Sequence, residues 1–221
     1  MWFLAISKNV FAGTTFLGQS DDGWIGEKIE SRKAFFKWQT YWKELEPEFA
    51  IKNFELKKKE DFNLRKVRDI SFDDLQKNKL LMHSFFSPNG KKAVNPFVTN
   101  IEPYEGKIYF VGDDYHEIRL FDFQQMVSLR LYSLQHYGPQ IHGLAWLSDD
   151  TLILIASDYK ETDNWTQFRS PLIVIFDFKN QEMREWIGKY VPISLYSKMK
   201  NWGFIVETLL MFYKASSVHI R

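Results

Sequence analysis

The chain has 221 residues, a formal net charge of +1 and no cysteine. This length allows one large domain or two small ones, and we expect a single domain over residues 1–221. The near-neutral charge gives no reason to expect binding to nucleic acid or to an anionic membrane. The lack of cysteine excludes disulfides, thiolate metal ligands and cysteine nucleophiles.

The amino-terminal sequence is apolar but lacks the features of a secretory signal. The run from Trp2 to Ile6 is short and no basic residue precedes it, whereas a signal peptide has a charged start and a longer apolar region. The longest later apolar runs, residues 151–156 and 204–213, are too short to span a bilayer. We therefore expect a cytoplasmic protein without membrane contact.

The first third of the chain is expected to change from strands to a charged, partly helical segment. Residues 1–26 contain short apolar runs between turn residues, and Asp22-Gly23 is a common hairpin signal, so we expect short strands there. Residues 27–70 are richer in charge. Within them, the apolar residues from Phe35 to Leu45 recur at helical spacing, which predicts a helix over residues 32–45.

Residues 51–68 carry the highest density of charge in the chain. Their apolar residues alternate in places, which predicts a solvated edge hairpin. A basic patch for nucleic acid is the alternative. Acidic residues interrupt the basic run, however, and we therefore favour a solvated face and expect no nucleic-acid partner.

From about residue 72 onward the sequence is typical of an antiparallel β protein. Twenty Phe, ten Tyr and eight Trp make 17% of the chain aromatic, and aromatic residues favour pleated, half-buried surfaces. We expect strands at residues 80–86, 107–112, 118–123, 128–134, 141–147, 151–156, 172–178, 181–187, 204–213 and 216–221. The turn Asp113-Asp114 should join the second and third of these as a hairpin, and a long polar insert, 157–170, should follow residues 151–156. The apolar runs at 151–156 and 172–175 suit strands buried on both faces.

One dipeptide repeats along the chain. Phe72-Asp73, Phe121-Asp122 and Phe176-Asp177 stand about 50 residues apart. Two similar turn segments accompany them, Phe85-Phe-Ser-Pro-Asn-Gly90 and Ala145-Trp-Leu-Ser-Asp-Asp150. A repeat of this length is one supersecondary unit that buries its faces by stacking on its neighbours.

These segments resemble the blades of WD40-like β-propellers over about residues 72–187. In that family a strand ends in Trp-Asp or a similar dipeptide, and a blade opens with an apolar pair and a turn similar to Ser-Pro-Asp-Gly. The family's Gly-His dipeptide is absent, although His142-Gly143 occurs in reversed order. The resemblance implies blade-like antiparallel meanders, in which Asp122 and Asp177 accept hydrogen bonds that hold the tight turn after the strand.

The length of the chain limits the number of blades. Propellers usually have four to eight four-stranded blades, and at ~50 residues per repeat this chain has room for four at most. It is then a very small propeller, a partial one that pairs with another chain, or a curved sheet or sandwich. We expect a mostly-β fold of antiparallel blade-like meanders, a small or partial propeller-like structure, with a short helical and charged segment near residues 32–68.

The densest cluster of potential metal ligands and acid–base groups lies at residues 113–117. Carboxylates beside a histidine can bind a divalent ion or share acid–base work, so Asp113, His116 and Glu117 are the candidates for such a site. A hairpin turn explains these residues more simply, because Asp tolerates the backbone angles of turns. No second cluster and no glycine-rich phosphate loop supports the site, and we expect neither a metal nor a cofactor.

Two histidines flank a loop. His136 and His142 lie on either side of residues 137–140, and loops on the axial face of a propeller are frequent binding positions. We therefore regard both as candidate partner-binding residues. A structural, hydrogen-bonded role is the alternative for each.

The polar insert is the other candidate for binding. It carries Tyr159, Trp165, Phe168 and Arg169, and Trp, Tyr and Arg dominate interface hot spots. The same aromatic residues could instead pack under the loop as a small satellite core.

These features favour a non-enzymatic module that binds another protein, such as a scaffold subunit or an immunity protein that blocks a toxin. The alternative is a small hydrolase or lyase, with His, Asp and Glu side chains that converge in a pocket. An exposed aromatic patch would favour the binding module, and converging polar groups would favour the enzyme.

Overall fold

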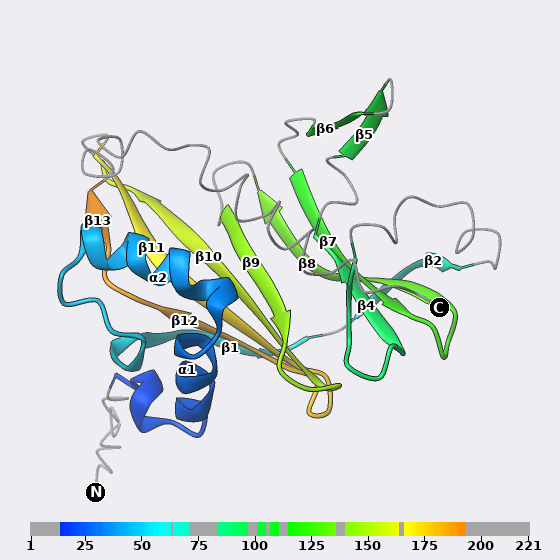
Figure 1. The fold of residues 1–221 in the computed structure, drawn as a ribbon, viewed down its shortest axis with the longest axis horizontal. Coiled ribbons are helices and arrows are strands. Elements are labelled where there is room, and N and C mark those ends of the chain that lie inside the picture. The colour runs from blue at the N-terminus through cyan, green and yellow to red at the C-terminus, as the bar shows by residue number, and fades with distance from the viewer. Residues whose placement is uncertain are drawn as a thin grey trace, which may run out of the picture.

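The computed structural model describes residues 14–62, 64–70, 84–96, 101–104, 107–110, 115–135, 140–163 and 166–192. This part of the chain is mostly β and has two large antiparallel sheets, a two-stranded ribbon and two short α-helices (Figure 1). The expected strands at 204–213 and 216–221, and the dipeptide Phe72-Asp73, lie outside the described residues.

The larger sheet has six strands in the order β1-β12-β11-β10-β9, with β13 added to β11. The strands are β1 (Glu55–Asp61), β9 (Gln140–Trp146), β10 (Thr151–Glu161), β11 (Gln167–Asp177), β12 (Glu182–Ile187) and β13 (Val191–Pro192).

The second sheet has five strands in the order β2-β8-β7-β4-β3. They are β2 (Arg65–Asp69), β3 (Phe85–Phe86), β4 (Lys92–Asn95), β7 (Tyr115–Asp122) and β8 (Val127–Gln135). The ribbon pairs β5 (Ile101–Tyr104) with β6 (Lys107–Phe110).

The predicted hairpin between residues 107–112 and 118–123 is wrong. Strand β6 pairs with β5, whereas β7 lies between β4 and β8. The expected turn Asp113-Asp114 lies outside the described residues. Alternation along both segments indicates strands but not which neighbour each strand chooses, and this is the reason for the error.

The two large sheets share one strand order. Strands β3, β4, β7 and β8 follow one another across the smaller sheet, as β9, β10, β11 and β12 do across the larger one. Phe121 lies on β7 and Phe176 on β11, the third strand of each series, and both rings are buried. The equivalent phenylalanines thus belong to the cores of adjacent sheets.

The turns after these strands are also alike. The Asp122 carboxylate accepts hydrogen bonds from the backbone N–H groups of Gln124 and Gln125, and that of Asp177 accepts one from Asn180. Each turn ends in a residue with a left-handed backbone, Met126 with φ 53° and Gln181 with φ 54°. A short acceptor side chain at the first position fits this geometry, because it satisfies the N–H groups that the turn leaves unpaired.

The sheets meet along their first strands. The indole N–H of Trp146 on β9 donates to the carbonyl oxygen of Phe85 on β3 at 2.8 Å. In the adjoining turns, the Asp149 carboxylate accepts the Asn89 N–H at 2.8 Å, and the Lys92 ammonium lies 2.9 Å from Asp150. Polar contacts between the two turn segments therefore connect the sheets at this edge.

The helices precede the sheets in the chain. They are the 3₁₀ turns η1 (Leu17–Gln19) and η2 (Ile51–Asn53) and the α-helices α1 (Gly23–Glu30) and α2 (Lys33–Leu45). The prediction of a helix over residues 32–45 is confirmed. Phe35, Trp38 and Trp42 are fully buried on one face of α2, while Phe36 on another face is 66% exposed.

The prediction of short strands over residues 1–26 is wrong from residue 17 onward, and residues 1–13 lie outside the described residues. Asp22 and Gly23 begin α1 and do not form a hairpin turn. The reason is tertiary: the Asp22 carboxylate accepts two hydrogen bonds from Arg184, at 2.7 and 2.9 Å, and one from the Trp186 indole. Those donors lie on β12, more than 160 residues away in sequence, and the local sequence around Asp22 does not predict them.

The central part of the six-stranded sheet, in β10 and β11, is buried on both faces. Helices α1 and α2 cover one face (Figure 1), where Ile153, Ile155 and Ile173 pack against Trp38 and Trp42. The opposite face, with side chains such as those of Leu154, Val174 and Phe176, packs against apolar residues of the five-stranded sheet. Double burial explains why these strands are continuously apolar, as their sequence predicts.

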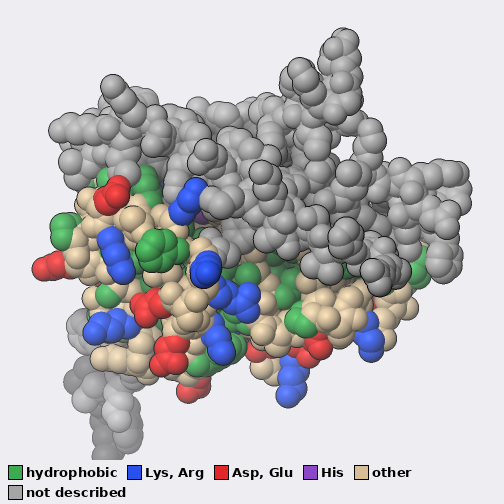
Figure 2. All heavy atoms as spheres, viewed as in Figure 1, with side chains coloured by type: hydrophobic (Ala, Val, Ile, Leu, Met, Phe, Trp, Pro, Cys, Tyr) green, Lys and Arg blue, Asp and Glu red, His purple; other side chains and the backbone are tan. Residues whose placement is uncertain are grey.

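Strands β1 and β2 correct the prediction of an edge hairpin over residues 51–68. Both are edge strands and both are rich in charge, but they do not pair with each other. Strand β1 pairs with β12 and β2 pairs with β8, so two consecutive strands complete two different sheets. Figure 2 shows Lys and Arg side chains interspersed with Asp and Glu over the coloured part of the surface.

No helix in the described parts of the chain combines the length and the apolar character that crossing a membrane requires.

Candidate functional site

The predicted polar loop 157–170 is mostly an extension of two strands. Strand β10 continues to Glu161 and β11 begins at Gln167, and the two pair in register from Thr151 opposite Asp177 to Glu161 opposite Gln167. The prediction of a loop is therefore wrong, because backbone pairing between two neighbouring strands continues through polar residues as well as apolar ones. Ser157, Asp158 and Ser170 are buried within this extension.

The side chains of the extended hairpin form a partly exposed surface. Tyr159 and Arg169 are cross-strand partners, and the guanidinium lies 5.2 Å from the centre of the tyrosine ring. The Tyr159 hydroxyl donates to Glu161 at 2.7 Å, and the Lys160 ammonium lies 5.7 Å from the ring of Tyr190. Phe168 is partly buried and faces Pro192 of β13 across the strand pair.

Several candidate residues fall outside this description. Trp165, His136 and Asp113 lie outside the described residues. His116 belongs to β7, but its side chain is not described.

Glu117 is held as a structural carboxylate. It is 2% exposed, and its two oxygens accept hydrogen bonds from Arg119 at 2.5 Å and Arg130 at 2.8 Å. Burial alone would raise the pKa of Glu117, but the hydrogen bonds and positive charges of the two arginines outweigh burial and lower the pKa. A carboxylate paired in this way is a poor proton acceptor. Among the described residues, no group of three or more His, Cys, Asp or Glu side chains could hold a metal ion.

His142 is a buried, neutral histidine. It is the extra residue of a bulge in β9, between Ile141 opposite Ala156 and Gly143 opposite Ile155. Its ring is 2% exposed, and neither ring nitrogen has a hydrogen-bond partner among the described residues. Burial, together with the smaller effect of the positive charge of Arg169, lowers the pKa of His142 to about 3.

The predicted residues His142, Tyr159 and Arg169 thus lie at the same end of the six-stranded sheet. Arg169 links them. Its guanidinium stacks on the Tyr159 ring and donates a hydrogen bond to the Ser157 hydroxyl at 3.4 Å, and its positive charge helps to lower the pKa of His142.

A buried polar network escaped the sequence analysis. Asp158 accepts hydrogen bonds from the Lys57 ammonium at 2.8 Å and the Tyr190 hydroxyl at 2.6 Å. Glu185 accepts one from the Tyr132 hydroxyl at 2.8 Å and lies 3.9 Å from the same ammonium. Burial and the neighbouring carboxylates raise the pKa of both tyrosines, so both stay protonated as donors. This network joins β8 of one sheet to β1, β10 and β12 of the other.

One signal in the sequence does point to Asp158. Residues of like parity along β10, namely Leu152, Leu154 and Ala156, are buried on one face, and Asp158 continues that series. A carboxylate at a buried strand position requires partners. Its cationic partner, Lys57, stands 101 positions away in the chain, where nothing in the local sequence identifies it.

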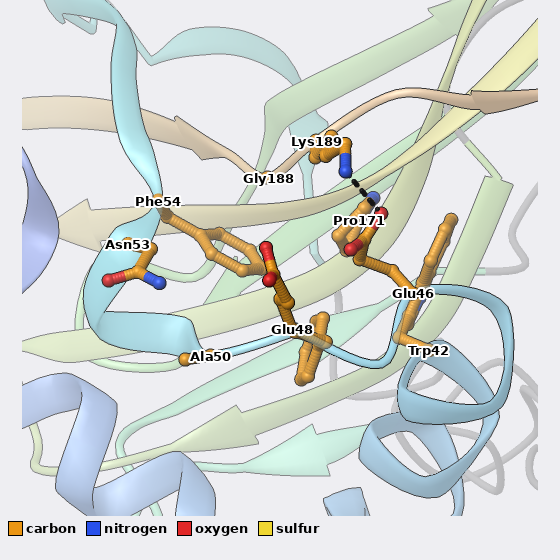
Figure 3. Close-up of a pocket in the computed structure, with 10 residues that line it drawn as sticks. Trp42, Glu46, Glu48, Ala50, Asn53, Phe54, Pro171, Gly188 and Lys189 are labelled. Atoms are coloured by element: carbon orange, nitrogen blue, oxygen red, sulfur yellow. Dashed lines mark ion pairs between the residues drawn. The ribbon is translucent and has the colours of Figure 1, made fainter.

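A small pocket opens where α2 ends. It has a volume of about 150 Å³ and is lined by Trp42, Glu46, Glu48, Phe49, Phe54 and Lys189, among others. We call it the α2 pocket. Figure 3 shows its side chains, which come from α2, from the segment that follows it, from Pro171 of β11 and from the connection after β12.

Comparisons with known proteins give no relative: no family model matches the chain, and no curated protein and no solved structure shows significant similarity to it.

Proposed function

We propose that this chain is a non-enzymatic protein-binding module whose partner contacts the end of the β10–β11 hairpin. The observation that carries the proposal is the pair formed by Tyr159 and Arg169. The two side chains stack at 5.2 Å on a partly exposed surface that extends past the doubly buried part of the sheet. Tyr and Arg are the residue types enriched in interface hot spots, and rigid scaffolds present such residues with little loss of entropy on binding.

The architecture fits this role. We propose that the two sheets are blade-like units of a small or partial propeller related to the WD40 class, on the ground of their shared strand order and matching Phe-Asp turns. Repeat scaffolds of this kind use insertions on one face for binding, and the β10–β11 hairpin extends beyond the length of the corresponding pair β4 and β7. Scaffold subunits and toxin-blocking immunity proteins are both binding modules of this type.

The enzymatic alternative receives no support from the described residues. Its candidate Glu117 has both carboxylate oxygens engaged by arginines, and His142 is enclosed in the interior. Neither side chain is placed to meet a substrate.

The test begins with the partner, captured from the source cells on the immobilised protein and then purified for affinity measurements. Trp165 lies in the connection between β10 and β11, and Trp165→Ala should weaken binding by at least ~2 kcal/mol, about thirtyfold. Tyr159→Ala and Arg169→Ala should each weaken it as well. The thermal midpoint of Trp165→Ala should stay at the wild-type value.

Lys179→Ala is the matched control, because Lys179 is exposed in the turn at the opposite end of β11. It should bind with wild-type affinity. Full affinity in all three hairpin variants would refute the proposed surface. A lowered thermal midpoint with only secondary loss of affinity would assign Trp165 to a satellite core instead.

A further inference from the structure

The walls of the α2 pocket are aromatic and well supported. Phe49 and Phe54 meet edge to face at 5.7 Å, and Trp38 packs behind both of them at 5.7 and 6.4 Å. Trp42 forms another part of the wall and is fully buried. Because each ring is held by the next, the pocket is preformed and a ligand need not order it.

Gly188 keeps the opposite wall close. A β-carbon at this position would lie 2.6 Å from Pro171 Cγ and 3.1 Å from the Phe54 ring, so only glycine allows both groups to pack here. Hydrogen bonds brace the segment, since the Gly188 N–H donates to Pro171 at 2.9 Å and the Ser170 hydroxyl donates to the Gly188 carbonyl at 2.6 Å. The volume of about 150 Å³ matches a cavity that can take a ligand the size of benzene.

The charged side chains of the pocket are mainly acidic. Glu46 and Glu48 line it together with one cation, Lys189 (Figure 3). The Lys189 ammonium lies 2.8 Å from the Glu46 carboxylate, whose side chain is only 15% exposed, whereas that of Lys189 is 68% exposed. The hydrogen bond to Glu46 raises the pKa of Lys189.

This ion pair shows what the site attracts. An ammonium already pairs with the enclosed Glu46 carboxylate, which lines the same pocket as Trp42 and Phe49. The Lys189 side chain is mostly in water and can swing away at little cost. Aromatic faces and a carboxylate together are the groups that recognise organic cations. We propose that the α2 pocket binds a compact alkylammonium group, which takes the place of the Lys189 ammonium on Glu46.

The proposal is independent of partner binding by the β10–β11 hairpin. A free amine and the lysine side chain of a peptide carry the same head group, and either could supply it. The Trp42 indole N–H, which has no hydrogen-bond partner among the described residues, provides a local reporter in nitrogen–proton correlation spectra.

The experiment titrates n-butylammonium into the ¹⁵N-labelled protein and follows the Trp42 indole signal, with n-butanol as the uncharged probe of the same shape. Butylammonium should shift the signal to saturation and butanol should not. Glu46→Gln should weaken butylammonium binding at least tenfold, because a neutral amide replaces the carboxylate. Lys189→Met should strengthen binding severalfold, because it vacates the carboxylate.

The pair formed by Lys59 and Glu182, at 2.7 Å, is the matched control. Its lysine is likewise more than half exposed and its glutamate enclosed, but neither residue lines the pocket. Lys59→Met and Glu182→Gln should therefore leave butylammonium affinity unchanged. If Glu46→Gln proves unstable, Lys189→Met carries the test, because it alters only an exposed side chain.

The proposal is overturned if butylammonium leaves the Trp42 signal unmoved, if butanol binds as well as the amine, or if Lys189→Met has no effect on affinity. A parallel titration with Nα-acetyl-lysine methylamide identifies the source of the head group. Affinity equal to that of butylammonium supports a lysine side chain, and affinity for butylammonium alone supports a free small amine.

Discussion

His142 places two polar ring nitrogens in the interior without hydrogen-bond partners among the described residues. Its pKa of about 3 lies below the ordinary value of 6.5 because burial and Arg169 disfavour the charged ring. Below about pH 6.5 the His142 ring is protonated in the unfolded chain but stays neutral in the folded protein. Stability is therefore complete above that pH and is lost as the pH falls toward 3.

His142→Leu should remove this dependence. Between pH 7.5 and pH 5.0 the wild-type protein should lose about 2 kcal/mol through this residue alone, and the variant should lose correspondingly less. Urea unfolding at the two pH values, carried out on both proteins, measures the difference. An identical loss in the two proteins would show that the ring is solvated or protonated in the folded state.

Phe176 is a second residue whose burial decides its role. Its ring is fully buried and meets Phe62 and Tyr132 edge to face, at 6.1 and 5.9 Å. Phe176→Ala should lower the free energy of unfolding by ~3–5 kcal/mol, since it leaves a cavity between the two sheets. Denaturant titration provides the measurement.

Phe36→Ala serves as its control, because that ring on α2 is 66% exposed and should contribute less than ~0.5 kcal/mol. Equal losses in the two variants would place the core elsewhere.

The apolar run before Phe176 predicted its burial from sequence. Nothing comparable predicted the environment of His142, which depends on a bulge in β9 and on Arg169 of β11, two strands away in the sheet.

At the level of elements, the two Phe-Asp turns depend on a carboxylate acceptor. Asp177 accepts hydrogen bonds from the backbone N–H of Asn180 at 3.0 Å and from its side-chain amide at 2.8 Å. Asp177→Ala should lower the free energy of unfolding by about 1 kcal/mol, the usual net value of such a bond. Asp177→Asn keeps a hydrogen-bond acceptor and should lower the free energy of unfolding by less than half as much as Asp177→Ala. The two variants can be compared by thermal melts, and equal losses would mean that charge rather than turn geometry matters.

Local patterns predicted the elements well where apolar residues recur at helical spacing or form a continuous run. The spacing from Phe35 to Leu45 located α2, and the apolar runs at 151–156 and 172–175 located the buried parts of β10 and β11. The errors arose where tertiary contacts override the local pattern. Arg184 and Trp186 draw Asp22-Gly23 into a helix start, and strand pairing carries β10 and β11 through the polar residues 157–170.

At the level of the whole molecule, Lys57 connects the charged network between the sheets. Removing its ammonium leaves Asp158 and Glu185, which are 7% and 6% exposed, without their shared cation. Lys57→Met should therefore lower the free energy of unfolding by about 1–3 kcal/mol, with solvent access to Lys57 keeping the loss below that of a fully buried pair. The control is Lys58→Met, at the next position in the chain, which breaks the exposed ion pair with Glu60. It should change the free energy of unfolding by less than ~0.5 kcal/mol. Equal stability of both variants in chemical denaturation would contradict the structural role of the network.

The sequence predicted a mostly-β antiparallel fold, but it could not predict how β1 and β2 join it. Their partners, β12 and β8, lie far along the chain, and charged alternating strands fit any open sheet edge. The network around Lys57 was not predicted for the same reason, because its members are far apart in the sequence. Of the candidate site residues, Tyr159 and Arg169 lie together, and their role in binding stays a prediction. The α2 pocket unites segments that no linear motif connects.

The placement of β1 also has a consequence for how the protein is made. On the ribosome, residues 55–61 emerge long before residues 182–187, the strand with which they finally pair. During that interval β1 is an unpaired strand that could join a neighbouring chain, and contacts this distant in sequence form slowly. Its run of Lys57, Lys58, Lys59, Glu60 and Asp61 keeps such a strand hydrated, because charged side chains oppose edge-to-edge aggregation. The charge that suggested a nucleic-acid surface is then better understood as protection for a strand that waits for its partner to be synthesised.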